Sequence, residues 1–161
     1  HSLMRRTLES LARENPFEKI WCFCDPALKN SPRIALLGKK LGSKVRLFFG
    51  DPRLPRYLAK ADMGLVSGGL TLFQALACGL PCAVISQYPH QAERAAAFAR
   101  RGLVINLGSS AKADWKDLAM ALRAARDNAA LRRQLSLAGR RFCDGKGLQR
   151  VTKIVWNLLQ K

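Results

Sequence analysis

The chain has 161 residues, of which 48% are apolar, and it carries 28 Lys and Arg residues against 11 Asp and Glu, a net charge of +17. This length and composition predict one globular domain with a buried core and exclude a disordered chain. No apolar run approaches the length of a bilayer-spanning helix, and the first residues lack the apolar segment of a signal peptide.

Apolar periodicity and turn residues predict short strands that alternate with helices. The expected strands cover residues 20–24, 45–49, 63–67, 82–86 and 103–107. The expected helices cover residues 3–14, 31–41, 54–60, 70–79, 91–101, 114–126, 129–142 and 148–159. This alternation predicts an α/β fold in which helices cover both faces of a parallel sheet. The last helix carries Leu148, Val151, Val155, Leu158 and Leu159 on one face, which predicts a stripe that faces the core.

A two-glycine turn, Ser67-Gly68-Gly69, leads from one strand into the helix that opens at Leu70 or Thr71. Glycines let a ligand approach the backbone, and the N–H groups and dipole of a helix N-terminus favour an anion. The turn is therefore either a seat for a phosphate or diphosphate or a tight turn that binds nothing.

The position of this turn in the predicted sheet favours the binding hypothesis. Ligands of parallel α/β sheets bind outside the carboxyl ends of the strands. We expect that edge to gather the glycine turn and the loops at 50–52 and 87–91, with the loop at 108–110 nearby.

The basic residues form dispersed pairs along the predicted helices, which is typical of solvated helix faces. Because no zinc signature or RNA-binding motif accompanies them, nucleic acid is a disfavoured partner. An anionic membrane surface stays open as a partner for a chain of this charge.

The cysteines and histidines indicate neither a metal site nor a nucleophile. The five cysteines lie in apolar segments without a CxxC motif, so we expect reduced, buried thiols, with Cys22 and Cys24 on one strand face. His90 is the one histidine in an interior loop, where it is either a phosphate contact or proton carrier, or a solvated residue. We assign no catalytic residue, no metal and no cofactor.

The region around the glycine turn resembles the nucleotide-binding half of GT-B glycosyltransferases. The matching pattern is Ala61-Asp62, an apolar strand, Ser67-Gly68-Gly69-x-Thr71-Leu72-Phe73, Ala75 and Gly79-x-Pro81. Similar groups are the lipid-linked N-acetylglucosamine transferase (glycosyltransferase family 28, C-terminal domain) and the UDP-sugar hydrolase of the pseudaminic acid pathway with its spore-coat polysaccharide relatives. Gln91, Gly102 and residues 144–151 also resemble the second group, and the similarity covers nearly the whole chain.

The resemblance implies a Rossmann-like three-layer α/β/α domain and a set of contacts to a UDP-sugar. In it, Gly68, Gly69, Leu70 and Thr71 would meet the diphosphate, with Ser67 and His90 beside them. Gln91 would reach the sugar or phosphate, and the loop with Gly50 would lie near the uracil.

Gln74 stands where these relatives usually have Glu, whose carboxylate accepts hydrogen bonds from the ribose hydroxyls. A Gln amide has one acceptor oxygen and makes weaker neutral hydrogen bonds, so we expect weaker binding or a different ligand. Alternatively, Gln74 is an ordinary, partly exposed helix residue.

The resemblance implies that residues 1–161 form a single nucleotide-sugar-binding domain of a two-domain protein, without its N-terminal half. That half would supply the acceptor site and the catalytic base, so this domain alone would bind weakly and be catalytically inert. The implied function is donor binding in a glycosyltransferase of surface polysaccharide or glycoconjugate assembly. The alternatives are the half-domain of a UDP-sugar hydrolase and a basic module that binds nucleic acid or a membrane surface. We expect a cytoplasmic location, with peripheral contact at the inner membrane face left open.

Overall fold

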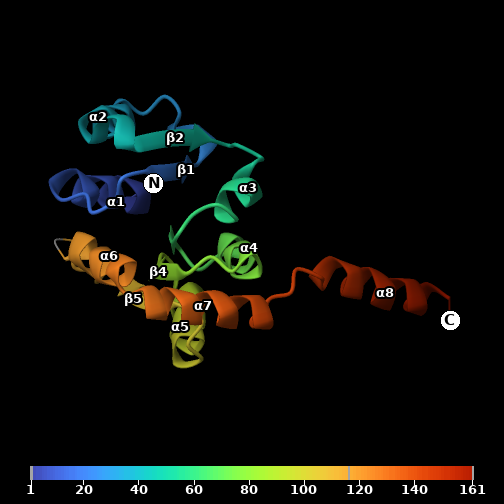
Figure 1. The fold of residues 1–161 in the computed structure, drawn as a ribbon. Coiled ribbons are helices and arrows are strands. Elements are labelled where there is room, and N and C mark those ends of the chain that lie inside the picture. The colour runs from blue at the N-terminus through green and yellow to red at the C-terminus, as the bar shows by residue number, and fades with distance from the viewer. Residues whose placement is uncertain (1, 116, 161) are drawn as a thin grey trace.

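The computed structural model describes residues 2–115 and 117–160, in which strands and helices alternate along the chain (Figure 1). The strands are β1 (Ile20–Cys24), β2 (Val45–Phe49), β3 (Gly64–Val66), β4 (Cys82–Ser86) and β5 (Ile105–Ser109). The helices are α1 (Ser2–Arg13), α2 (Pro32–Leu41), α3 (Leu54–Leu58), α4 (Leu70–Cys78), α5 (Pro89–Arg100), α6 (Leu118–Asp127), α7 (Ala129–Phe142) and α8 (Gly147–Leu159).

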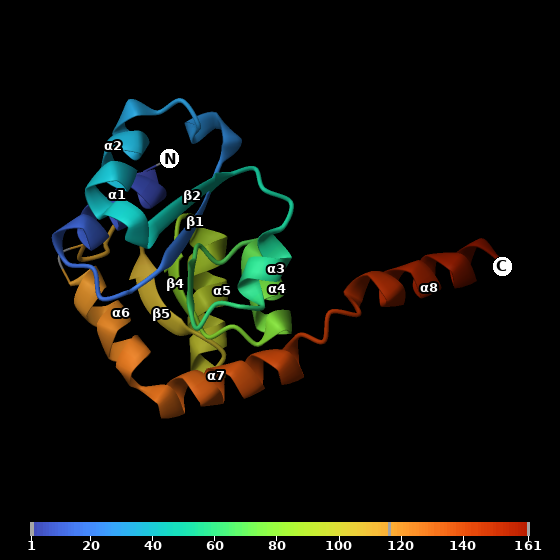
Figure 2. The same ribbon diagram turned by 45° about the horizontal axis from the view of Figure 1, so that its top comes forward.

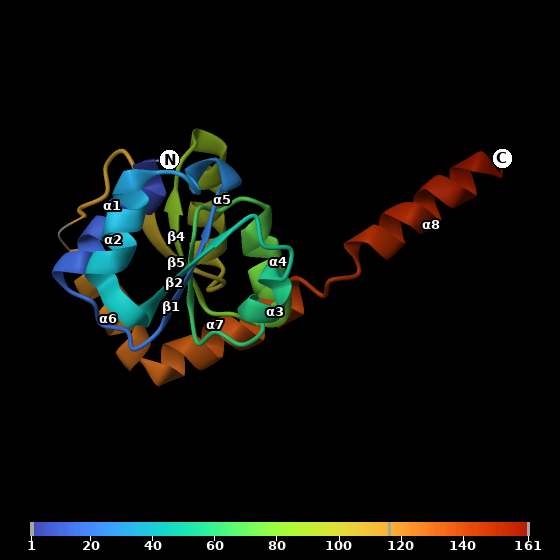
Figure 3. The ribbon, with the colours of Figure 1, turned by 90° about the horizontal axis from the view of Figure 1, so that it is seen from above.

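Every strand pair is parallel, as the alternation predicts. β1 pairs with β2, and β3, β4 and β5 pair in that order, so the strands form two ladders. All five residues of β4 are buried, which is expected for a central strand of a parallel sheet. Helices α1, α2 and α6 lie on one side of the strands, and α3 and α4 lie on the other (Figure 3). The predicted three-layer α/β/α fold is confirmed.

The core occupies both faces of the sheet because side chains alternate along β4. Cys82 and Val84 pack with a cluster on the side of α4 and α5, which includes Leu72, Leu76, Ala95 and Phe98. Ala83 and Ile85 pack with the opposite cluster, which includes Leu8, Cys22, Cys24, Leu118 and Leu122. Cys22 and Cys24 therefore share one strand face, as predicted. Figure 2 shows α7 running below both α4 and α5, where it closes the lower end of the domain.

β3 is one residue shorter at each end than predicted, and two other elements next to the candidate site have boundaries that are wrong by two residues. β5 begins at Ile105 and extends to Ser109, so Gly108 and Ser109 belong to the strand; Leu103 and Val104 are buried core residues at the end of the preceding turn. α5 begins at Pro89 because proline fits the first helical position, where no N–H partner is needed. His90 and Gln91 therefore lie in the first turn of a helix. Similarly, α6 begins at Leu118 and not at Asp114.

The prediction of a core-facing stripe on the last helix is wrong. α8 extends away from the body of the domain in every view (Figures 1 to 3). All of residues 147–160 are exposed, and Leu148 and Leu159 keep 80% and 78% of their surface accessible. Helical spacing shows that a helix is amphipathic, but it does not say which body covers the apolar face. None of the described helices is both long and apolar enough to span a bilayer.

The cysteines provide a test of the packing. Burial raises the pKa of the Cys22 and Cys82 thiols to about 12 and also raises the pKa of Cys24. Because the thiolate is the reactive form, we expect alkylation at neutral pH to modify only the half-buried Cys78 and Cys143 in the native protein. Mass spectrometry of the alkylated chain checks this, and the same reaction in denaturant should modify all five. Rapid modification of Cys82 in the native chain would contradict the packing of β4.

Candidate functional site

The glycine turn lies between the carboxyl end of β3 and the N-terminus of α4. Gly68 is buried with φ of 86°, and a Cβ at this position would lie 3.3 Å from Val84 Cγ1 and 3.4 Å from Gln91 Cβ. Both the positive φ and the close packing require glycine here. Gly69 has φ of −84°, and a Cβ there would meet only Gln91 Nε2, at 3.7 Å. Gly69 is therefore the open side of the turn.

The N-terminus of α4 has no side-chain cap, because the N-cap residue is Gly69, which has no side chain. The N–H of Leu72 donates to the carbonyl oxygen of Gly69 at 3.1 Å. The N–H groups of Leu70 and Thr71 lie in the first turn of α4. No carbonyl oxygen of the helix precedes them in a position to accept their hydrogen bonds. Leu70 is 84% exposed and Thr71 is partly exposed, so this end of the helix borders solvent, from which an anion can approach it.

Arg94 of α5, which is not among the predicted site residues, supplies a cation at this turn. Its Nη1 donates to the carbonyl oxygen of Gly68 at 2.7 Å, and its guanidinium lies 5.4 Å from the centroid of the Phe73 ring. A guanidinium has five N–H donors and suits phosphate oxygens. Arg94 follows Gln91 by three residues, a spacing that places both on one helix face and could have indicated it.

Gln91 is 7% exposed and lies directly behind the glycine turn. Its Oε1 accepts a hydrogen bond from the N–H of Gln87 at 2.9 Å, which fixes the loop before α5. Its Nε2 faces Gly69. This geometry makes Gln91 a residue that positions the turn, and its predicted contact with a sugar or phosphate stays a prediction.

Ser86 ends the central strand at the same edge of the sheet. Strand alternation puts it on the face of Cys82 and Val84, against which α4 and α5 pack. Ser86 is 1% exposed, and its Oγ has no hydrogen-bond partner among the described residues. A buried hydroxyl without a partner is rare in a folded protein and calls for an explanation. Ser67, at the end of the neighbouring strand β3, is half-buried.

The other predicted site residues lie further from the turn or face solvent. Gln74 and His90 are exposed on α4 and α5, and the His90 ring stacks on that of Tyr88, with 5.8 Å between centroids. Gly50 follows β2 with φ of 64°, packed against the Pro26 turn, where a Cβ would lie 2.9 Å from Pro26 Cγ. The structure thus places Gln91 against the segment from Ser67 to Thr71, whereas Gly50 lies at the end of the β1–β2 ladder.

Asp51 is a turn residue in the loop that follows β2. Its Oδ1 accepts a hydrogen bond from the N–H of Arg53 at 2.8 Å, and its carboxylate pairs with the Arg53 guanidinium. These hydrogen bonds from Arg53 lower the pKa of Asp51 to about 2. The carboxylate therefore stays ionised at neutral pH and does not act as an acid. In the described residues, no group of three or more His, Cys, Asp or Glu side chains could hold a metal ion.

Comparisons with known proteins confirm the resemblance that the sequence predicts. The chain is 35% identical to the spore coat polysaccharide biosynthesis protein SpsG of Bacillus subtilis (strain 168) over 104 residues, which are 65% of this chain and 31% of SpsG. It therefore spans less than a third of this relative. No protein-family profile matches the chain.

Two solved structures show the same fold over nearly the whole chain. The glycotransferase of kitacinnamycin superimposes with a TM-score of 0.71 and 19% identity, over 98% of this chain and 39% of that protein. HepE of Anabaena, whose structure holds UDP and glucose, superimposes with a TM-score of 0.69 and 13% identity, over 97% of this chain and 44% of HepE. The chain therefore has the Rossmann-like α/β fold of one part of these larger proteins.

Proposed function

We propose that this chain is the donor-binding domain of a glycosyltransferase that uses a UDP-sugar in polysaccharide or glycoconjugate assembly on the cytoplasmic side of the membrane. The observation that carries this proposal is the uncapped N-terminus of α4 behind two glycines, with the Arg94 guanidinium at the Gly68 carbonyl. The positive end of the α4 dipole, the open backbone at Gly69 and the Arg94 guanidinium together favour the binding of a diphosphate. The similarity to SpsG and the fold shared with HepE support this proposal.

The proposed chemistry places the leaving diphosphate at the first turn of α4. Negative charge grows on that diphosphate as the glycosidic bond to the sugar breaks. Preorganised N–H groups of Gly69, Leu70 and Thr71 would stabilise this charge, and Arg94 would add a nearby cation. Arg94 would hold the turn in shape through the hydrogen bond that it donates to the Gly68 carbonyl. Gln91 would fix the loop before α5 through the hydrogen bond that it accepts from the N–H of Gln87.

We further propose that the domain works as one half of a two-domain protein, because it spans only 31% of SpsG and 39% of the kitacinnamycin glycotransferase. The strand edges support, in addition, a further strand in this domain's own sheet. β1 and β3 each have one edge without a strand partner among the described residues. Both strands are uncharged and apolar, which is typical of interior strands, whereas β2 carries Arg46 at the other edge of its ladder. A further parallel strand between β1 and β3 would unite the two ladders into one sheet with the order of a doubly wound fold.

A UDP-sugar hydrolase half-domain is the second candidate function, favoured by the similarity to SpsG and the sequence pattern at residues 144–151. It would use the same diphosphate seat, with water in place of the sugar acceptor. Addition of the complementary half and of UDP-N-acetylglucosamine would separate the two, because a hydrolase releases free sugar without an acceptor.

The test of nucleotide binding is a titration of the chain with UDP, followed by the amide signals in an NMR spectrum. We expect shifts at Gly68, Gly69, Thr71 and Arg94, and smaller shifts for UMP, which lacks the second phosphate. The Gly50 loop and Gln74 should respond to the uracil and ribose. The absence of any response to millimolar UDP, together with salt-sensitive binding to DNA, would overturn the proposal in favour of a basic binding module.

Replacement of Gln74 by Glu tests the proposed ribose contact. We expect Gln74→Glu to bind UDP about three- to tenfold more tightly, because a carboxylate accepts stronger hydrogen bonds from both ribose hydroxyls. Isothermal titration with UDP and with deoxy-UDP measures this, and the gain should be smaller without the 2′-hydroxyl. Gln134→Glu, at an exposed site on α7, controls for the added charge. An equal gain in both variants would assign the effect to net charge alone.

A further inference from the structure

The buried hydroxyl of Ser86 lies beneath the candidate site without a hydrogen-bond partner. Ser86 ends the central strand β4 and is 1% exposed, and its Oγ makes no hydrogen bond to the described residues. A hydroxyl that leaves water without gaining a hydrogen bond raises the free energy of the state in which it is unpaired. Since this domain's own elements already enclose Ser86, a partner for the hydroxyl has to come from inside the domain or from a ligand bound against it.

The carbonyl oxygen of Gly68 is an acceptor on the same side of the sheet. β3 and β4 pair Val66 with Val84. Two residues further along each strand are Gly68 and Ser86, which this register brings side by side. A Cβ at Gly68 would lie 3.3 Å from Val84 Cγ1, so the two segments stay in contact beyond the ladder. The Gly68 carbonyl accepts from Arg94 of α5, and the Ser86 side chain points to the face that α5 covers.

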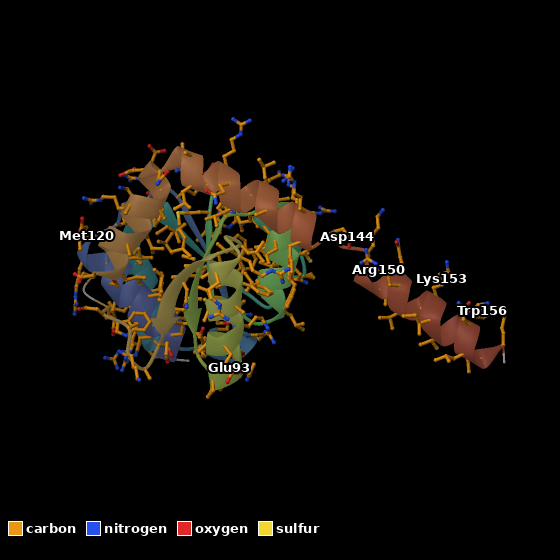
Figure 4. The ribbon with its side chains drawn as sticks, turned by 90° about the horizontal axis from the view of Figure 1, so that it is seen from below. Glu93, Met120, Asp144, Arg150, Lys153 and Trp156 are labelled. Atoms are coloured by element: carbon orange, nitrogen blue, oxygen red, sulfur yellow. The ribbon has the colours of Figure 1, made fainter. Side chains whose placement is uncertain are left out.

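Arg94 holds this carbonyl in the structure, although a carbonyl is not the strongest partner of a guanidinium. Arg94 Nη1 lies 2.7 Å from the Gly68 oxygen. In the part of the chain that the structure describes, none of the ion pairs involves Arg94. The acid next to it, Glu93, is exposed at the outer end of α5 (Figure 4). A phosphate oxygen binds a guanidinium more strongly than a neutral carbonyl does, so a diphosphate at the α4 N-terminus would attract Arg94 and weaken its bond to Gly68.

We propose that Ser86 is a positioning residue of the diphosphate seat, whose hydroxyl donates to the Gly68 carbonyl once a diphosphate attracts Arg94. This inference rests on the proposed function. The carbonyl oxygen has two lone pairs, so it accepts from Ser86 while Arg94 divides its donors between the carbonyl and the phosphate. Gly68 and Gly69 permit the small backbone rotation that this requires, because neither has a Cβ. The new hydrogen bond keeps the first turn of α4 in shape while Arg94 holds the ligand.

The hydroxyl of Ser86 is thus unpaired in the ligand-free domain and paired in the complex. Its hydrogen bond contributes to nucleotide affinity and not to the stability of the ligand-free domain. A serine with a purely structural role would have the reverse effect, because its loss would destabilise the domain whether or not nucleotide is bound.

Ser86→Ala tests this difference. We expect the affinity for UDP to fall about three- to tenfold, which is the effect of one hydrogen bond. The melting temperature of the ligand-free variant should not fall, because the variant loses only an unpaired hydroxyl. Calorimetric titration with UDP and thermal unfolding measure the two effects. Ser10→Ala removes another buried serine hydroxyl, 3% exposed on α1 at the other face of the sheet, and should leave the affinity for UDP unchanged.

The same serine substitution in an Arg94→Met background tests the link to Arg94. Methionine keeps an apolar stem near the Phe73 ring but donates no hydrogen bond, so Ser86 is expected to pair with Gly68 without any ligand. In this background Ser86→Ala should lower the melting temperature by about 2–4 °C. It should change the affinity for UDP by less than about twofold, since the hydrogen bond no longer depends on the ligand.

The outcomes separate this inference from the proposed function. If the original chain binds UDP and Ser86→Ala binds it equally well, the positioning role is wrong and the nucleotide site stands. A lower melting temperature of Ser86→Ala in the otherwise unchanged chain would assign Ser86 a structural role and also overturn the inference. Equal affinity losses with and without Arg94 would remove the proposed link between the two residues. Failure of the original chain to bind UDP would overturn the proposed function and this inference together.

Discussion

Gly69→Val is expected to weaken UDP binding strongly while the domain stays folded. Gly69 has φ of −84° and ψ of −154°, an extended conformation that valine adopts readily. A Cβ there meets only Gln91 Nε2, at an ordinary contact distance of 3.7 Å. The valine methyl groups would instead fill the space through which a phosphate reaches the N–H groups of Leu70 and Thr71. We expect an affinity loss of about a hundredfold, because several charge-assisted hydrogen bonds disappear together.

Calorimetric titration with UDP measures this loss, and thermal unfolding followed by circular dichroism verifies the fold. Gly147→Val is the matched control, since a Cβ at Gly147 has no neighbour within 4 Å and its φ is not positive. Gly68→Val is unsuitable as a test, because the φ of 86° and the contact with Val84 would destabilise the domain whatever the ligand does. If Gly69→Val bound UDP as well as the original chain, the phosphate would be seated elsewhere.

The sequence predicted the strands best where strong turn residues bound an apolar run. β1, β2 and β4 have the predicted ends. Each is bounded by residues that disfavour a strand, which are Asp25-Pro26, Gly50-Asp51-Pro52 and Leu80-Pro81. β5 was displaced by two residues because Leu103 and Val104 are as apolar as strand residues but fill the core after α5. The apolar pattern of a sequence indicates which residues are buried, but it does not indicate which of them pair with a neighbouring strand.

The candidate site was predicted in part, and the missing parts depend on tertiary structure. A two-glycine turn before a helix is visible in the sequence as a possible anion seat. The Arg94 contact with Gly68 joins residues 26 positions apart, and the unpaired hydroxyl of Ser86 appears only once the packing of α4 and α5 on β4 is known. The exposed face of α8 was missed for the same reason, since its periodicity equals that of a buried helix.

Leu76→Ala is expected to destabilise the domain by about 2–5 kcal/mol, because it leaves a cavity in a core that cannot fully collapse. Leu76 is fully buried in α4, and α7 approaches it so closely that a Cβ at Gly139 would lie 3.1 Å from Leu76 Cδ2. Leu70→Ala makes the same change at a residue of the same helix that is 84% exposed, and should cost less than about 0.5 kcal/mol. Urea unfolding of both variants measures the difference. α4 carries the proposed phosphate seat at its N-terminus and this core contact in its middle. Similar stability of the two variants would contradict the packing of α7 on α4, and with it the rigidity of α4 on which the phosphate seat depends.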